Sequence, residues 1–162
     1  MSTTRKASAV ILAGIIFGLG IGLALGVLWW RLAPRVEFVV KSGQFVDFDT
    51  KGFMAPDVAF GALAIVAGLL VTIGLARMRR EHLISVLIAA VLSGLIGSFG
   101  MWWVGHWLGK VDIAGLAGTE SVVAETPLAL HLGAMFLVWP IVAAAVVTIL
   151  ALEDWLSGLK RS

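Results

Sequence analysis

The chain contains no cysteine among its 162 residues. This absence excludes disulfide bonds, thiolate catalysis and cysteine-ligated metal sites, and it leaves the redox compartment undetermined. No catalytic or ligand-binding motif stands out, and the segments between the apolar stretches are too short to hold a soluble catalytic domain. We therefore expect a protein that is not an enzyme and carries no cofactor.

Charged residues are also missing from four long apolar stretches. Each stretch is long enough to cross a hydrocarbon core of about 30 Å at about 1.5 Å per helical residue. None alternates with the period of two that barrel strands show, and only helices or closed barrels satisfy their own backbone groups inside a bilayer. The sequence predicts an all-α membrane protein, residues 1–162 forming one domain. Its transmembrane helices are expected at 7–30, 58–76, 83–105 and 128–152.

Ionisable residues are absent from the middle third of all four predicted spans. Near that depth, the polar side chains are the hydroxyls of Thr72, Ser93 and Ser98. Ion-coupled transporters, proton pumps and voltage sensors use a buried ionisable group at this depth. The sequence therefore disfavours a self-sufficient pump or drug/proton antiporter.

The charges are distributed unequally between the two predicted sides of the membrane. The side with both termini and the turn 77–82 has seven basic and three acidic residues, a net charge of +4. The other side has five basic and seven acidic residues, a net charge of −2. The positive-inside rule predicts a multi-pass protein of the cell (plasma) membrane with both termini and the tail 153–162 in the cytoplasm. The pI near 9.4 accompanies a net charge of only +2, so we expect no nucleic-acid partner.

The first predicted external loop, 31–57, has the pattern of a small β-hairpin. Two β-rich runs, Val36–Val40 and Phe45–Asp49, flank a short turn that contains glycine, and prolines bracket the loop. A hairpin alone is marginal in water, so this one is expected to lean on the membrane surface, the other external loop or a partner protein. The second external loop, 106–127, shows no clear periodicity.

The fourth predicted helix contains two local signals. Thr126 as the N-cap with Pro127 at the first helical position predicts that the helix begins there. Pro140, inside the same apolar stretch, removes one backbone hydrogen bond and predicts a kink.

Small residues form a ridge on two of the predicted helices, and such ridges allow close helix packing in membranes. Two interpretations remain open: the ridges pack against each other within the chain, or one of them faces another subunit. The ridge of the first helix consists of Gly14, Gly18, Gly22 and Gly26, and that of the third consists of Ala90, Gly94 and Ser98.

Tryptophans gather at the predicted external boundary, where indoles anchor helices at the headgroup level. They form either an aromatic belt in contact with membrane lipids or the lining of a lipid or quinone headgroup site. The members are Trp29, Trp30, Trp102, Trp103 and Trp107.

Two histidines belong to the same external layer. His106 and His131, with Asp57, form either a metal or proton-sensing trio or a set of ordinary interfacial groups. Because no metal-ligand spacing connects them, we predict no metal site.

Several short sequence motifs occur in order along the chain. They are Trp29-Trp30 with 33–37, the entry 55–70 into the second span, the Arg-rich turn, 94–98, 103–109, and Pro127-Leu128 leading to 138–140. Together these motifs resemble a family of four-transmembrane-helix membrane proteins of unknown function found in actinobacteria. This resemblance covers nearly the whole chain and implies a four-helix multi-pass fold in the cell membrane, but no activity.

The sequence favours a non-enzymatic accessory or structural subunit of a larger membrane complex, such as a respiratory supercomplex or cell-envelope machinery. Its expected partners are other integral membrane subunits and membrane lipids. The alternative is a small homo-oligomeric transporter or a lipid- or quinone-binding membrane protein that uses the tryptophans and histidines of the external layer.

Overall fold

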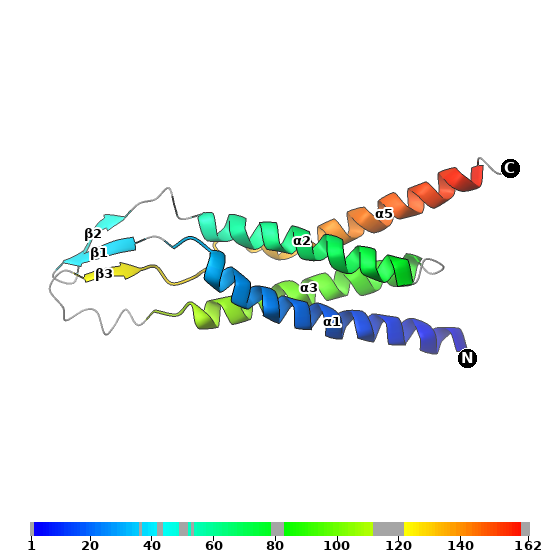
Figure 1. Cartoon of the computed structure of the whole chain (residues 1–162), viewed down its shortest axis with the longest axis horizontal. Coiled ribbons are helices and arrows are strands. Elements are labelled where there is room, and N and C mark those ends of the chain that lie inside the picture. Colours follow the sequence, from blue (N-terminus) through cyan, green and yellow to red (C-terminus); the bar gives the residue numbers. More distant parts are fainter. Residues whose placement is uncertain are drawn as a thin grey trace.

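The computed structural model describes residues 2–35, 37–41, 44–48, 52, 54–78, 83–111 and 122–159. Parts of the predicted turn 77–82, of the hairpin turn, of the second loop and of the tail lie outside these ranges. The four long helices are α1 (Ser2–Leu32), α2 (Ala55–Met78), α3 (Leu83–Leu108) and α5 (Val138–Leu159). Both termini lie at one end of the bundle and all strands at the other, which we call the sheet end (Figure 1).

Four helical segments of the described residues are long and apolar enough to cross a membrane, and the last of them begins before α5, at Gly133. These segments confirm the predicted multi-pass architecture, by length and composition. They span Ile11–Leu32, Ala55–Arg77, Leu83–Leu108 and Gly133–Ser157.

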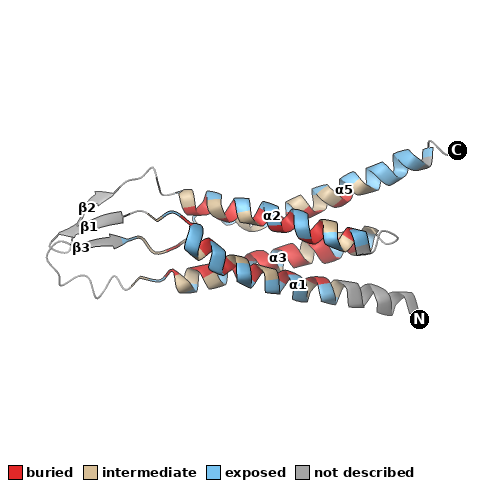
Figure 2. Ribbon diagram, viewed as in Figure 1, coloured by how far each residue is buried: buried red, intermediate tan, exposed pale blue. Residues whose placement is uncertain are grey.

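Helix α3 lies between α1 and α5, and α2 packs mainly against α5. In the most apolar window of each span, 44% of the α3 residues and 39% of the α2 residues are buried, against 22% for α1 and for the fourth span. Burial is concentrated on the faces that the helices turn toward one another (Figure 2). The fold is therefore a bundle in which α1 and α5 present the largest outward surfaces.

A three-stranded antiparallel sheet lies beyond the helices. Its strands are β1 (Glu37–Lys41), β2 (Gln44–Phe48) and β3 (Val122–Glu125), in the order β2-β1-β3. Strand β1 pairs with β2, with an irregularity between Val39 and Val40, and also with β3. The sheet differs from the two-stranded hairpin that the sequence predicts, because part of the second loop pairs with β1 as a third strand.

The fourth span begins later than the sequence predicts. Residues 126–132, which we call the strap, form no helix, and the short 3₁₀-helix η3 (Gly133–Leu137) precedes α5. The backbone N–H of Leu128 donates to the carbonyl of Gly109 at 3.1 Å, which ties the strap to the end of α3. The predicted helix start at Thr126-Pro127 is therefore wrong. Pro140 lies in the first turn of α5, next to the η3 junction, and not within a continuous helix.

Candidate functional site

The glycine ridge of α1 is buried against α3 of the same chain. A Cβ atom added at Gly22 would lie 2.2 Å from the carbonyl oxygen of Gly97, so the two backbones are in direct contact. This arrangement supports the intramolecular interpretation, because the ridge is covered without another subunit. The contacts pair Gly14 with Ala89, Gly18 with Ser93, Gly22 with Gly97 and Gly26 with Met101.

The predicted ridge of α3 faces α5 and not α1. A Cβ atom at Gly94 would lie 3.0 Å from the indole Cδ1 of Trp139, and Ala90 and Ser98 are buried beside it. The residues of α3 that meet α1 lie one position earlier in the chain. Gly97 serves both contacts, since its added Cβ would meet the Trp139 ring at 2.6 Å and the carbonyl of Gly18 at 2.9 Å.

Four buried polar atoms in the helical core make no hydrogen bond among the described residues. They are Thr72 Oγ1, Ser93 Oγ, Ser98 Oγ and Trp139 Nε1. Sequence analysis found the three hydroxyls but not the indole of Trp139. A buried polar group without a partner carries a desolvation cost of about 1–3 kcal/mol, so these atoms do not stabilise the fold.

We expect Ser93→Ala to leave the free energy of unfolding unchanged or to raise it by about 1 kcal/mol, because the change removes a buried hydroxyl that has no partner. Denaturation of the purified chain in detergent measures this. Ser85→Ala, at a half-buried position of the same helix, is the control and is expected to change stability little. A clear loss of stability for Ser93→Ala alone would mean that the hydroxyl stabilises the fold, and it would contradict this prediction.

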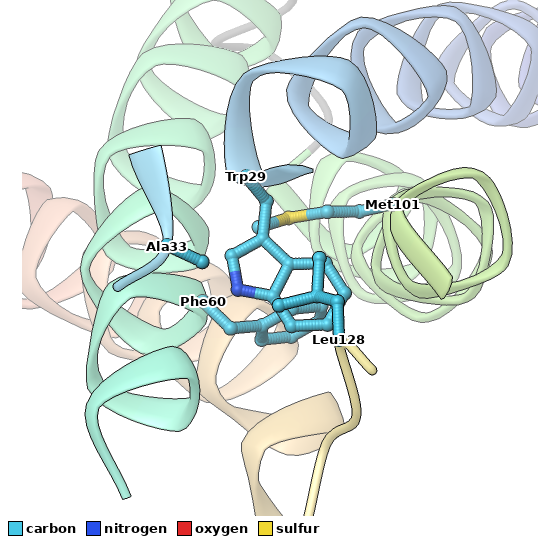
Figure 3. Close-up of a cluster of buried hydrophobic side chains, with 5 residues drawn as sticks. All are labelled: Trp29, Ala33, Phe60, Met101 and Leu128. Atoms are coloured by element: carbon cyan, nitrogen blue, oxygen red, sulfur yellow. The ribbon is translucent and has the colours of Figure 1, made fainter. Parts of the chain in front are cut away.

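Trp29 is a core residue of the sheet end and does not contact lipid. Its side chain is fully buried, and its indole Nε1 donates to the carbonyl of Pro56 at 2.8 Å. Phe60 meets the indole edge-on, with 5.2 Å between ring centroids. Figure 3 shows the cluster that surrounds the indole, which consists of Ala33, Phe60, Met101 and Leu128.

Asp57, in the first turn of α2, is completely buried and binds the strap. Its carboxylate accepts the backbone N–H of Leu132 at 2.7 Å and that of His131 at 3.1 and 3.2 Å. Nδ1 of His131 lies 3.5 Å from the same carboxylate. Charge-assisted bonds of this kind are strong, and an acidic residue at a helix N-terminus is favoured by the helix dipole. Asp57 is therefore the main link between α2 and the strap.

His106 contacts the strap at a different point. Its Nδ1 lies 3.2 Å from the carbonyl oxygen of Leu128, and the indole of Trp102 stacks on its ring at 5.6 Å. The predicted trio thus contains one pair, Asp57 with His131, while His106 meets the backbone. Within the described residues, no three acidic or histidine side chains are grouped so as to hold a metal ion.

The predicted tryptophan layer divides into different environments. Trp103 and Trp107 are 57% and 62% exposed on the outer face of α3, while Trp102 is half-buried against His106. Trp30 is half-buried and lines an open cavity at the end of α1. The tryptophans therefore do not line one common site.

The cavity beside Trp30 has a volume of about 230 Å³. Arg35 spans it, with one guanidinium nitrogen 2.6 Å from the carboxylate of Glu125 and the other donating to the carbonyl of Trp30 at 3.1 Å. The guanidinium carbons of Arg31 and Arg35 lie 5.8 and 5.9 Å from the Trp30 ring centroid. Sequence analysis missed this group, because pairing of β3 with β1 brings Glu125 to Arg35 from 90 residues away.

No family model matches the chain, and no curated protein or solved structure matches it significantly. The resemblance to the actinobacterial membrane family therefore stays a prediction.

Proposed function

We propose that the chain is a non-enzymatic subunit of a larger integral membrane assembly. We place the docking surface on the distal part of α5, residues 148–157. This part diverges from the other helices (Figure 1), and its residues are exposed (Figure 2). The exception is Leu150, which is half-buried against the core cluster that contains Val147. The outward side chains include Ile149 and Trp155, which are 57% and 62% exposed.

Two acidic residues distinguish this surface from one that contacts only lipid. Glu153 and Asp154 follow the apolar residues directly, are exposed, and form no ion pair with any described residue. Cytoplasmic loops of membrane proteins carry an excess of lysine and arginine. The occupant that fits is therefore a transmembrane helix of another subunit with basic residues at its cytoplasmic end.

The glycine ridge of α1 does not support this docking, because it is already covered by α3. A respiratory supercomplex or cell-envelope machinery remains the proposed kind of assembly. The alternative, a small homo-oligomeric transporter or a lipid- or quinone-binding membrane protein, stays a prediction.

Site-specific photocrosslinking in native membranes tests this function. A photoreactive residue at Leu152 or Trp155 is expected to yield one defined adduct with another membrane protein. The same residue at Leu70, which is 68% exposed on α2, is expected to yield none. Glu153→Lys with Asp154→Lys should lower the yield at Leu152 several-fold, because like charges would then face the partner.

Equal adduct yields from Leu152 and Leu70 would contradict specific docking through α5. So would an adduct yield at Leu152 that is the same with and without the two lysine substitutions at Glu153 and Asp154. If the adduct instead joined two copies of this chain, α5 would be a surface for self-association and not for docking to another subunit.

A further inference from the structure

We propose that the cavity between Arg31 and Arg35 binds the phosphate group of an anionic phospholipid. This inference does not depend on the proposed docking of α5. The cavity is lined by residues at and just after the end of α1, and that end of α1 lies at the opposite end of the bundle from the distal part of α5 (Figure 1).

The cavity offers hydrogen-bond donors that the fold does not use. A guanidinium group carries five N–H donors. Arg35 uses one donor for Glu125 and one for the Trp30 carbonyl, and Arg31 makes no hydrogen bond to any described residue. Guanidinium groups bind phosphate oxygens through paired, charge-assisted hydrogen bonds. The unused donors of both arginines therefore suit a phosphate group.

The local charge favours an anion with one negative charge. Arg31 and Arg35 contribute two positive charges to the cavity lining, and Glu125 contributes one negative charge. One positive charge remains uncompensated among the lining residues. A phosphodiester carries a single negative charge and would neutralise it.

The position of the cavity selects a lipid as the source of that phosphate. The apolar segment of α1 extends through Trp30, and tryptophan marks the headgroup level of a membrane. Arg31 and Arg35 follow directly, at the depth where the phosphates of membrane lipids lie. A volume of about 230 Å³ suits a headgroup, whereas sites for whole drug-sized ligands occupy roughly 300–1,000 Å³.

The lining is held in position before a ligand arrives. Glu125 and the Trp30 carbonyl fix two nitrogens of Arg35, and the Trp30 ring lies near both guanidinium carbons. Groups that are already ordered lose less conformational entropy on binding. Arg35 is therefore expected to position the phosphate, and Arg31 to close over it.

Native mass spectrometry of the purified full chain tests the proposal with phosphatidylglycerol and phosphatidylcholine as probes. The chain is expected to retain one phosphatidylglycerol in preference to phosphatidylcholine. Arg31→Gln should weaken this retention about tenfold, the factor that loss of one charge-assisted hydrogen bond typically brings. Arg77→Gln, in the last turn of α2 at the other end of the bundle, removes the same charge and should have no effect.

Glu125→Gln keeps the test informative if an arginine variant fails to fold. Glutamine keeps an oxygen that can accept from Arg35 but removes the negative charge. Arg35 therefore stays in place while the net positive charge of the cavity rises, so retention should become tighter. Weaker retention in Glu125→Gln, or equal losses in Arg31→Gln and Arg77→Gln, would overturn the proposal.

Inorganic phosphate distinguishes the two sources of the ligand. If phosphatidylglycerol survives an excess of inorganic phosphate, the lipid is the ligand. If inorganic phosphate binds the chain and displaces the lipid at equal concentration, the cavity serves a soluble anion and the lipid proposal is wrong.

Discussion

Gly22→Ala is expected to lower the free energy of unfolding by about 3 kcal/mol, at the upper end of the usual cost of overpacking a core. The new Cβ atom would lie 2.2 Å from the carbonyl oxygen of Gly97 and 2.7 Å from its Cα. Both atoms belong to a helix backbone, so no side chain can rotate away and the two helices must separate. Because α3 also holds α5, the separation reaches the core on its other side. Denaturation of the purified chain in detergent measures the loss.

Gly20→Ala is the matched control. Gly20 lies two residues earlier on α1, is exposed, and has nothing within 4 Å of an added Cβ atom. Alanine is a better helix former than glycine by about 0.5–1 kcal/mol, so this variant should be equal to the wild type or more stable. If Gly22→Ala left the isolated chain as stable as Gly20→Ala and only reduced assembly with other proteins, the ridge would be a surface for another subunit.

The number of spans could be predicted because apolar length alone decides it. The residue at which the fourth helix starts could not be predicted, because apolar length does not mark a helix start. Apart from His131, residues 128–137 are apolar, whether they continue the helix or form the strap and η3, so hydropathy does not separate the two arrangements. The strap is stabilised by hydrogen bonds to Gly109 and Asp57, which are distant in sequence. These bonds determine that residues 126–132 do not form a helix.

The contact face of α3 shows a second limit of sequence analysis. Small residues occur on α3 as neighbouring pairs, Ala89 with Ala90 and Gly97 with Ser98 among them. Both faces of the helix therefore allow close packing, and spacing does not reveal which face meets α1. The structure places the Ala89 face against α1 and the Gly94 face against Trp139 of α5.

The candidate phosphate site depends on tertiary structure. Arg31 and Arg35 follow the first predicted span and are among the five basic residues counted on the external side. Glu125 was visible in a loop without clear periodicity. Only the pairing of β1 with β3 brings this carboxylate to Arg35 and closes one side of the cavity.

Asp57→Ala is expected to destabilise the chain by about 3–5 kcal/mol and to release the strap. The carboxylate accepts two backbone N–H groups of the strap, at His131 and Leu132, and each would cost about 1–3 kcal/mol if left without a partner. The strap also carries Leu128 into the cluster around Trp29, so its release would open that core. Denaturation in detergent measures the stability, and hydrogen exchange at the amides of residues 131 and 132 measures the release.

Asp154→Ala and Asp57→Asn separate the anchoring role from a general effect of charge. Asp154 is exposed on α5 and bonds no described backbone group, so its loss should change stability by less than about 0.5 kcal/mol. Asparagine at position 57 keeps one acceptor oxygen. The hydrogen-exchange rates at the amides of residues 131 and 132 should therefore lie between those of the wild type and those of Asp57→Ala. If exchange at these amides were equal in Asp57→Ala and the wild type, the strap would be held by its other contacts, through Gly109 and His106, and Asp57 would not be its anchor.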